Sequence, residues 1–88
     1  MHKVYLLLGG NLGNRTLYLQ QARESINQRV GSINHVSKVY ETAAWGKTDQ
    51  PTFLNQVLMV ETDLSPEDVL QSINTIEQAL GRIRQEHW

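Results

Sequence analysis

Two arginines near the end of the sequence, Arg82 and Arg84, are the side chains best suited to bind a charged ligand. Because one residue separates them, both guanidinium groups point to the same side of an extended segment. Two forked cations on one side form a clamp for a polyphosphate. Arginines that follow the end of a helix also offset the helix dipole, so a structural interpretation of the pair has at least equal weight.

A second group of candidate binding residues lies in or beside the long connection from Tyr40 to Asn55. A hairpin normally needs only about two to five linking residues, so a longer connection that carries Trp45 favours a functional role. The alternative is that Trp45 plugs the edge of the core. Asn55 interrupts an apolar strand face two residues after Phe53. A buried amide needs hydrogen-bond partners, which either the backbone or a flat heterocycle would supply.

Two further features have simpler interpretations. Gly9-Gly10-Asn11-Leu12-Gly13 resembles a phosphate-binding turn, but it lacks the full Gly-x-Gly-x-x-Gly spacing, so an ordinary turn out of a strand is favoured. His35 has no partner at the spacing of a metal site, which favours a surface residue.

The composition excludes several classes of protein. The chain has 88 residues, which indicates one domain, and 40% of them are apolar. The net charge is -1 and the basic residues are scattered, which argues against a nucleic-acid or membrane-binding face. There is no cysteine, so disulfides and thiolate chemistry are excluded. The apolar run at the start is too short to cross a membrane, and we expect a cytoplasmic protein.

Hydrophobic periodicity predicts three strands and two helices. The continuous apolar run Val4–Leu8 predicts a strand buried on both faces and therefore central in its sheet. Ile33–Thr42 and Phe53–Thr62 are the other predicted strands, and both faces of the last one carry apolar residues, which predicts that both are covered. One helix begins at the N-cap Asn14 and is ended by Gly31.

The second predicted helix begins at Ser65-Pro66, a strong helix start, and ends at Gly81. Its apolar residues recur at helical spacing and predict a buried stripe of Val69, Leu70, Ile73, Ile76 and Leu80. The order strand, helix, strand, strand, helix predicts an α+β sandwich. This order is that of the ferredoxin-like fold without its last strand.

Several short motifs occur together along the chain, and their combination is more specific than any one of them. They are Leu8-Gly9-Gly10-Asn11-Leu12-Gly13-Asn14-Arg15, Tyr40-Glu41-Thr42, Trp45-Gly46, Asp49-Gln50-Pro51, Phe53-Leu54-Asn55, Glu61-Thr62, Ile76-Glu77, and Leu80-Gly81-Arg82-Ile83-Arg84 with Trp88. The combination closely resembles the 6-hydroxymethyl-7,8-dihydropterin pyrophosphokinases of folate biosynthesis. The likeness extends from Lys3 to Trp88.

This resemblance implies an activity and a set of site residues. ATP would transfer its β,γ-diphosphate to the hydroxymethyl group of 6-hydroxymethyl-7,8-dihydropterin and leave as AMP. Five residues match the family's pterin pocket by position: Thr42, Trp45, Phe53, Asn55 and Trp88. Two match its catalytic, nucleotide-binding arginines: Arg82 and Arg84. Two more resemble residues on the nucleotide side: Leu70 and Glu77.

The resemblance also implies Mg²⁺, bound in the family by an Asp-x-Asp pair that follows Trp-Gly-Pro-Arg. The aspartates here are Asp49, Asp63 and Asp68, none in such a pair. We therefore expect residues 1–88 to be the N-terminal portion of the domain and inactive alone. The absent strand would pair beside the strand Val4–Leu8. Without it, Val4–Leu8 has a bare apolar edge, which favours self-association. The alternative function is a non-catalytic, small-molecule-binding or self-associating domain of the same fold.

Overall fold

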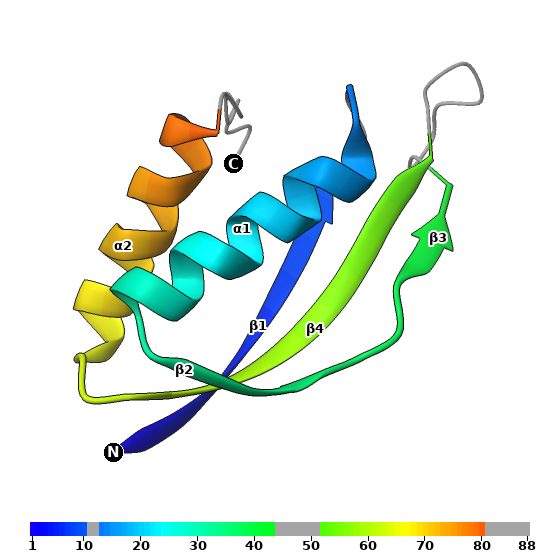
Figure 1. The fold of residues 1–88 in the computed structure, drawn as a ribbon. Coiled ribbons are helices and arrows are strands. Elements are labelled where there is room, and N and C mark those ends of the chain that lie inside the picture. Colours follow the sequence, from blue (N-terminus) through cyan, green and yellow to red (C-terminus); the bar gives the residue numbers. More distant parts are fainter. Residues whose placement is uncertain (11–12, 44–51, 81–88) are drawn as a thin grey trace.

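The computed structural model describes residues 1–10, 13–43 and 52–80. Six elements follow one another along the chain: β1 (His2–Gly10), α1 (Arg15–Arg29), β2 (Ser32–Val36), β3 (Tyr40–Thr42), β4 (Phe53–Thr62) and α2 (Pro66–Ala79). Both helices lie on the same side of the sheet (Figure 1). Neither helix is long and apolar enough to cross a membrane.

The longest strand, β4, organises the sheet. On one side it pairs antiparallel with β1, in a register that runs from His2 opposite Thr62 to Gly10 opposite Leu54. On its other side it pairs antiparallel with β2 and, further along, with β3. β1 and β2 therefore run parallel to each other with β4 between them, and α1 connects them. This split β-α-β unit confirms the predicted α+β, ferredoxin-like arrangement.

The strand predicted over residues 33–42 is two strands. β2 has a register shift between Ile33 and His35, and residues 37–39 separate it from β3. Ser37 still bonds β4, because its N–H donates to the Val57 carbonyl at 2.9 Å and its Oγ accepts from the Val57 N–H at 2.9 Å. The imperfect alternation of the sequence reflects this break.

Both predicted helix caps are confirmed. The Asn14 side chain accepts a hydrogen bond from the Leu17 N–H at 3.0 Å, and Ser65 accepts one from the Asp68 N–H at 3.2 Å. Each cap satisfies a backbone donor that the first turn of a helix leaves without an intrahelical partner. The caps therefore fix where both helices begin.

The core lies between the helices and one face of the sheet. Leu58 and Val60 of β4 are completely buried there. The helix α1 contributes Leu19, Ala22 and Ile26 to this core, each at most 2% exposed. Burying one such aliphatic side chain stabilises a fold by about 1.5–3 kcal/mol.

The helix α2 covers this core less completely than its sequence predicts. Val69 and Ile76 are buried, but Leu70, predicted to belong to the buried stripe, is 59% exposed. Successive helical residues are about 100° apart, so the turn that buries Val69 rotates Leu70 away from the core. That part of the prediction is wrong.

The prediction that β1 is central and buried on both faces is also wrong. Among the described residues β1 pairs only with β4, so it is an edge strand. Its residues alternate, and Tyr5 and Leu7 are 72% and 71% exposed on the face away from the helices. No described element covers this face of β4 either, where Val57 is exposed. An apolar run predicts a strand, but it does not show that both faces are packed.

Candidate functional site

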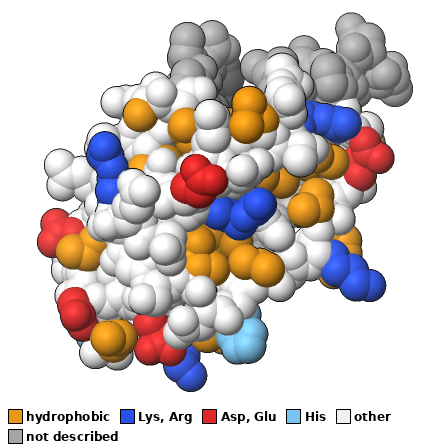
Figure 2. Space-filling model, viewed as in Figure 1, with side chains coloured by type: hydrophobic (Ala, Val, Ile, Leu, Met, Phe, Trp, Pro, Cys, Tyr) orange, Lys and Arg blue, Asp and Glu red, His pale blue; other side chains and the backbone are white. Residues whose placement is uncertain are grey.

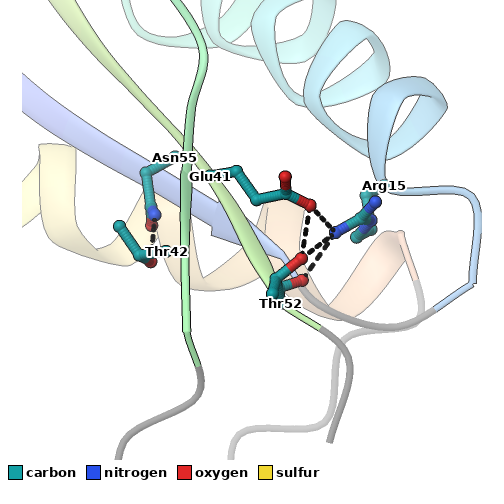
Figure 3. Close-up of polar contacts among 5 residues, drawn as sticks. All are labelled: Arg15, Glu41, Thr42, Thr52 and Asn55. Atoms are coloured by element: carbon teal, nitrogen blue, oxygen red, sulfur yellow. Dashed lines mark hydrogen bonds and ion pairs between the residues drawn. The ribbon is translucent and has the colours of Figure 1, made fainter.

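The predicted site residue Asn55 lies on the open face of the sheet, near the start of β4. Its Nδ2 donates a hydrogen bond to Oγ1 of Thr42, the last residue of β3, at 2.8 Å (Figure 3). A side-chain hydroxyl is therefore its partner in the structure, where the sequence suggested the backbone or a ligand. An amide carries two donor hydrogens and an acceptor oxygen, and this bond uses one of the hydrogens.

Gly9 makes room for the same amide. It stands opposite Asn55 in the β1–β4 register, and a Cβ at Gly9 would lie 2.9 Å from the Asn55 Oδ1. Gly9 and Gly10 are the last two residues of β1, so the predicted turn does not begin at them. Only Gly13 among the described glycines has a positive φ, of 62°. The first two glycines thus serve close packing, and Gly13 serves the chain reversal.

Phe53 completes the part of the predicted pterin pocket that the structure describes. It stands opposite Thr42 in the β3–β4 ladder and shares a strand face with Asn55. The ring is half-buried. The structure therefore brings three predicted residues together, an aromatic ring, a hydroxyl and an amide, which suit a flat ligand with polar edges. Four predicted site residues lie outside the described ranges: Trp45, Arg82, Arg84 and Trp88.

The two residues predicted for the nucleotide side lie on α2. Leu70 and Glu77 are seven residues apart, about two helical turns, so they share one side of the helix. Glu77 is half-buried and lines a small hollow of about 60 Å³ together with Ile73, Ile76 and Tyr18. These positions are on the helical layer, whereas Asn55 points to the opposite face of the sheet. Among the described residues, the nucleotide-side residues and the pterin-side residues therefore lie on opposite faces of the sheet and do not form one pocket.

Sequence reasoning missed a polar cluster of Arg15, Glu41 and Thr52, next to the Thr42–Asn55 pair in Figure 3. The Arg15 Nη1 donates to the Thr52 carbonyl at 2.8 Å and to its Oγ1 at 2.7 Å, and it lies 3.3 Å from the Glu41 Oε2. The Thr52 hydroxyl donates to the same carboxylate oxygen at 2.5 Å. One clue was available, since α1 opens on an arginine with no acidic residue in its first turn.

The cluster changes the acidity of Glu41. The hydrogen bond from the Thr52 hydroxyl, and then that from Arg15, lower the pKa of the Glu41 carboxyl below its usual value. Because the pKa is lower in the folded state, the stabilisation is present above the unfolded pKa of about 4.3 and is lost as pH falls through the folded value.

We expect a ¹³C carboxyl titration by NMR to give Glu41 a pKa below the ordinary value, and Thr52→Val to raise it. The matched control is Thr75→Val, because Thr75 lies on α2 and donates to the Gln71 carbonyl. A Glu41 pKa that is the same in the Thr52→Val protein would contradict the contact.

Elsewhere on the helical side of the molecule, lysine and arginine side chains lie apart from one another, with acidic and hydrophobic side chains between them (Figure 2). Among the described residues, no group of three or more His, Asp and Glu side chains could hold a metal ion. The Thr42–Asn55 pair and the Arg15–Glu41–Thr52 cluster lie beside each other, at the end of β3 and the start of β4.

The fold is an α+β domain of the ferredoxin-like class, with a cluster of polar side chains at one end of its sheet. Residues 5–88 match the family model described as 7,8-dihydro-6-hydroxymethylpterin-pyrophosphokinase (HPPK). The chain belongs to this pyrophosphokinase family, which confirms the resemblance found in its motifs.

Curated relatives agree with the family model. The chain is 43% identical over 79 residues to the 2-amino-4-hydroxy-6-hydroxymethyldihydropteridine pyrophosphokinase of Porphyromonas gingivalis, a match that covers 90% of this chain and 54% of the relative. The enzyme of the same name from Bacillus subtilis is 39% identical over 85 residues, which are 96% of this chain and 51% of the relative. The one from Aquifex aeolicus is 40% identical over 88 residues, 100% of this chain and 54% of the relative. The chain thus spans about half the length of the curated relatives it matches.

Proposed function

We propose that the protein to which this chain contributes transfers the diphosphate of ATP to 6-hydroxymethyl-7,8-dihydropterin. The hydroxymethyl oxygen forms a bond to the β-phosphorus, the bond from that phosphorus to the α-phosphate oxygen breaks, AMP leaves, and the hydroxyl proton is released. The observation that carries the proposal is the hydrogen-bonded Asn55–Thr42 pair beside Phe53. The resemblance implies that these residues belong to the pterin pocket, and their proximity in the structure supports this assignment.

In this proposal, the open-face residues bind the pterin. The amide of Asn55 and the hydroxyl of Thr42 meet the polar edge of the ring, and Phe53 contacts its face. Trp45 and Trp88 complete the pocket. The catalytic Arg82 and Arg84 bind the phosphates and hold the charge that shifts during transfer, while Leu70 and Glu77 line the nucleotide side.

Mg²⁺ is the metal that this reaction class implies, where it neutralises phosphate charge and orients the two substrates. The described residues do not fit such a site, because they contain no cluster of acidic and histidine ligands. We therefore propose that residues 1–88 are the N-terminal portion of a pyrophosphokinase domain. The Mg²⁺ ligands would be the paired aspartates of the continuation that the resemblance implies.

The test is AMP release from Mg-ATP with and without 6-hydroxymethyl-7,8-dihydropterin. Two proteins are compared: residues 1–88 alone, and an extended protein in which the C-terminal half of the Porphyromonas gingivalis relative follows Trp88. We expect no pterin-dependent AMP from the first and pterin-dependent AMP from the second. If the extended protein folds but neither binds the pterin nor releases AMP, the proposal is wrong and the alternative of a non-catalytic domain gains support.

A cytoplasmic location stays a prediction.

We also propose that residues 1–88 associate through β1. The outer edge of β1 has no partner among the described residues, and the side chain of Leu7, a residue of this strand, is 71% exposed. Unpaired strand edges with apolar side chains pair readily with other chains, and a lysine on the edge opposes this. We expect sedimentation velocity to show concentration-dependent dimers that Leu7→Lys abolishes.

The matched control for association is Leu70→Lys, because Leu70 is 59% exposed and belongs to α2 and not to the edge strand. It should leave the dimers unchanged. A clean monomer of the unsubstituted chain at high concentration would overturn the proposed association.

A further inference from the structure

Arg15 occupies a position that local structure disfavours. It is the first residue of α1, next to the N-cap Asn14, and the first turn contains no acidic residue. The N-terminus of a helix carries partial positive charge, so a cation there is unfavourable unless another group compensates it. Residues that break a local preference are commonly held by tertiary structure or function. The compensating groups here come from β3 and from the residue that precedes β4.

The guanidinium group connects three segments that are far apart in sequence. Its Nη1 contacts Thr52, 37 residues away, and Glu41, 26 residues away. The Arg15 side chain is 30% exposed and its bonds to Thr52 are partly shielded from water, whereas the Glu41 side chain is 58% exposed. The Thr52 hydroxyl accepts from Arg15 and donates to Glu41, which closes a three-membered network. Such a network fixes the start of α1, the middle of β3 and the start of β4 relative to one another.

The strand that carries Thr42 depends on such contacts. β3 has three residues, all exposed, and pairs only with β4 among the described elements. Alternation places Glu41 on one face of β3 and Thr42 on the other. The Arg15–Glu41–Thr52 network therefore holds β3 from the helical side, and the Thr42–Asn55 bond holds it from the open side (Figure 3).

We propose that Arg15 is a positioning residue for the pterin subsite, and that it acts through Glu41 and Thr52 to keep Thr42 in register with Asn55. This inference rests on the proposed function. Arg15 touches neither substrate in it. Loss of the network would let the short strand shift, so that the hydroxyl and the amide no longer present their polar groups together to one ligand edge. The cost would appear in pterin binding and not in nucleotide binding.

The experiment uses the extended protein and measures steady-state kinetics for both substrates, together with pterin affinity by ligand fluorescence. We expect Arg15→Met to raise KM and Kd for the pterin about tenfold, with KM for ATP unchanged. Arg15→Lys retains a donor and should recover part of the loss, whereas a role in packing alone would be served equally well by methionine. Glu41→Gln, which keeps an acceptor, should have a smaller effect than Arg15→Met.

The matched control is Arg29→Met. Arg29 lies in the last turn of the same helix and is exposed. It should leave both KM values unchanged, and equal thermal stability of the two methionine variants at the assay temperature separates positioning from unfolding. A double-mutant cycle between Arg15→Met and Asn55→Ala should show coupling in pterin Kd, because the second substitution removes the group that Arg15 helps to align.

The outcomes separate this inference from the proposed function. Pterin binding by the unsubstituted protein that Arg15→Met leaves unchanged would overturn only the inference. Equal losses for both substrates would overturn it too, since they would indicate a general structural role. No pterin binding by the folded, unsubstituted protein would overturn the proposed function and this inference with it.

Discussion

Replacing Gly31 with alanine is expected to destabilise the fold by roughly 3 kcal/mol, at the upper end of the usual cost of overpacking. A Cβ at this position would overlap the carbonyl oxygen of Glu61 and lie 2.9 Å from its carbonyl carbon. These are backbone atoms of β4, which cannot move aside without breaking their ladder. A small domain has only about 5–15 kcal/mol of stability, so a large part of it would be lost.

Urea denaturation followed by circular dichroism measures this effect as a lower midpoint. The control is Ser32→Ala, because Ser32 is the next residue and is exposed. It should leave the midpoint almost unchanged. A Gly31→Ala protein as stable as the unsubstituted one would mean that α1 does not approach β4 as closely as the structure indicates.

Replacing Asn55 with alanine is expected to weaken pterin binding to the extended protein by about 100-fold, because the substitution leaves polar groups of both the ligand and Thr42 without a partner. The amide donates to the Thr42 hydroxyl at 2.8 Å and is the polar group at the centre of the proposed subsite. ATP affinity should stay the same, since the residues proposed for the nucleotide lie elsewhere. Fluorescence titration of the pterin and calorimetric titration of a non-hydrolysable ATP analogue measure the two affinities.

The matched control is Asn34→Ala. Asn34 is an exposed amide on β2 that donates to Glu61, at the far end of β4 from Asn55. Glu61 lies six positions after Asn55 in the strand, a span of about 20 Å. The control should bind the pterin normally. If both alanine variants bind it equally well, Asn55 is not part of the subsite.

Local chemistry allowed the sequence to predict the helices. The caps at Asn14 and Ser65 depend on groups three residues away, and the buried stripe of α1 depends on a repeat of about 3.6 residues. Gly31 was correctly predicted to follow the end of α1, but the physical reason lies elsewhere. Its φ is not positive, and the lack of a side chain is needed for contact with β4, which only the folded structure shows.

The sequence also placed Thr42, Phe53 and Asn55 in one candidate pocket through their resemblance to a family, and the strand register brings these three together. It could not show that β1 is an edge strand in the described sheet, since an apolar run has the same sequence pattern whether one or both faces are packed. It also could not show that Leu70 is exposed, because helical periodicity does not give the width of the buried stripe.

The contacts around Arg15 show which features follow from the sequence and which follow only from the tertiary structure. The sequence by itself determined the two helices, the α+β class and the family, because capping, periodicity and short motifs involve residues close together in the chain. Only the tertiary structure decided that Arg15 meets Glu41 and Thr52, 26 and 37 residues away. Such contacts depend on strand register and on the angle at which a helix crosses the sheet, and these follow from the packing of the whole core.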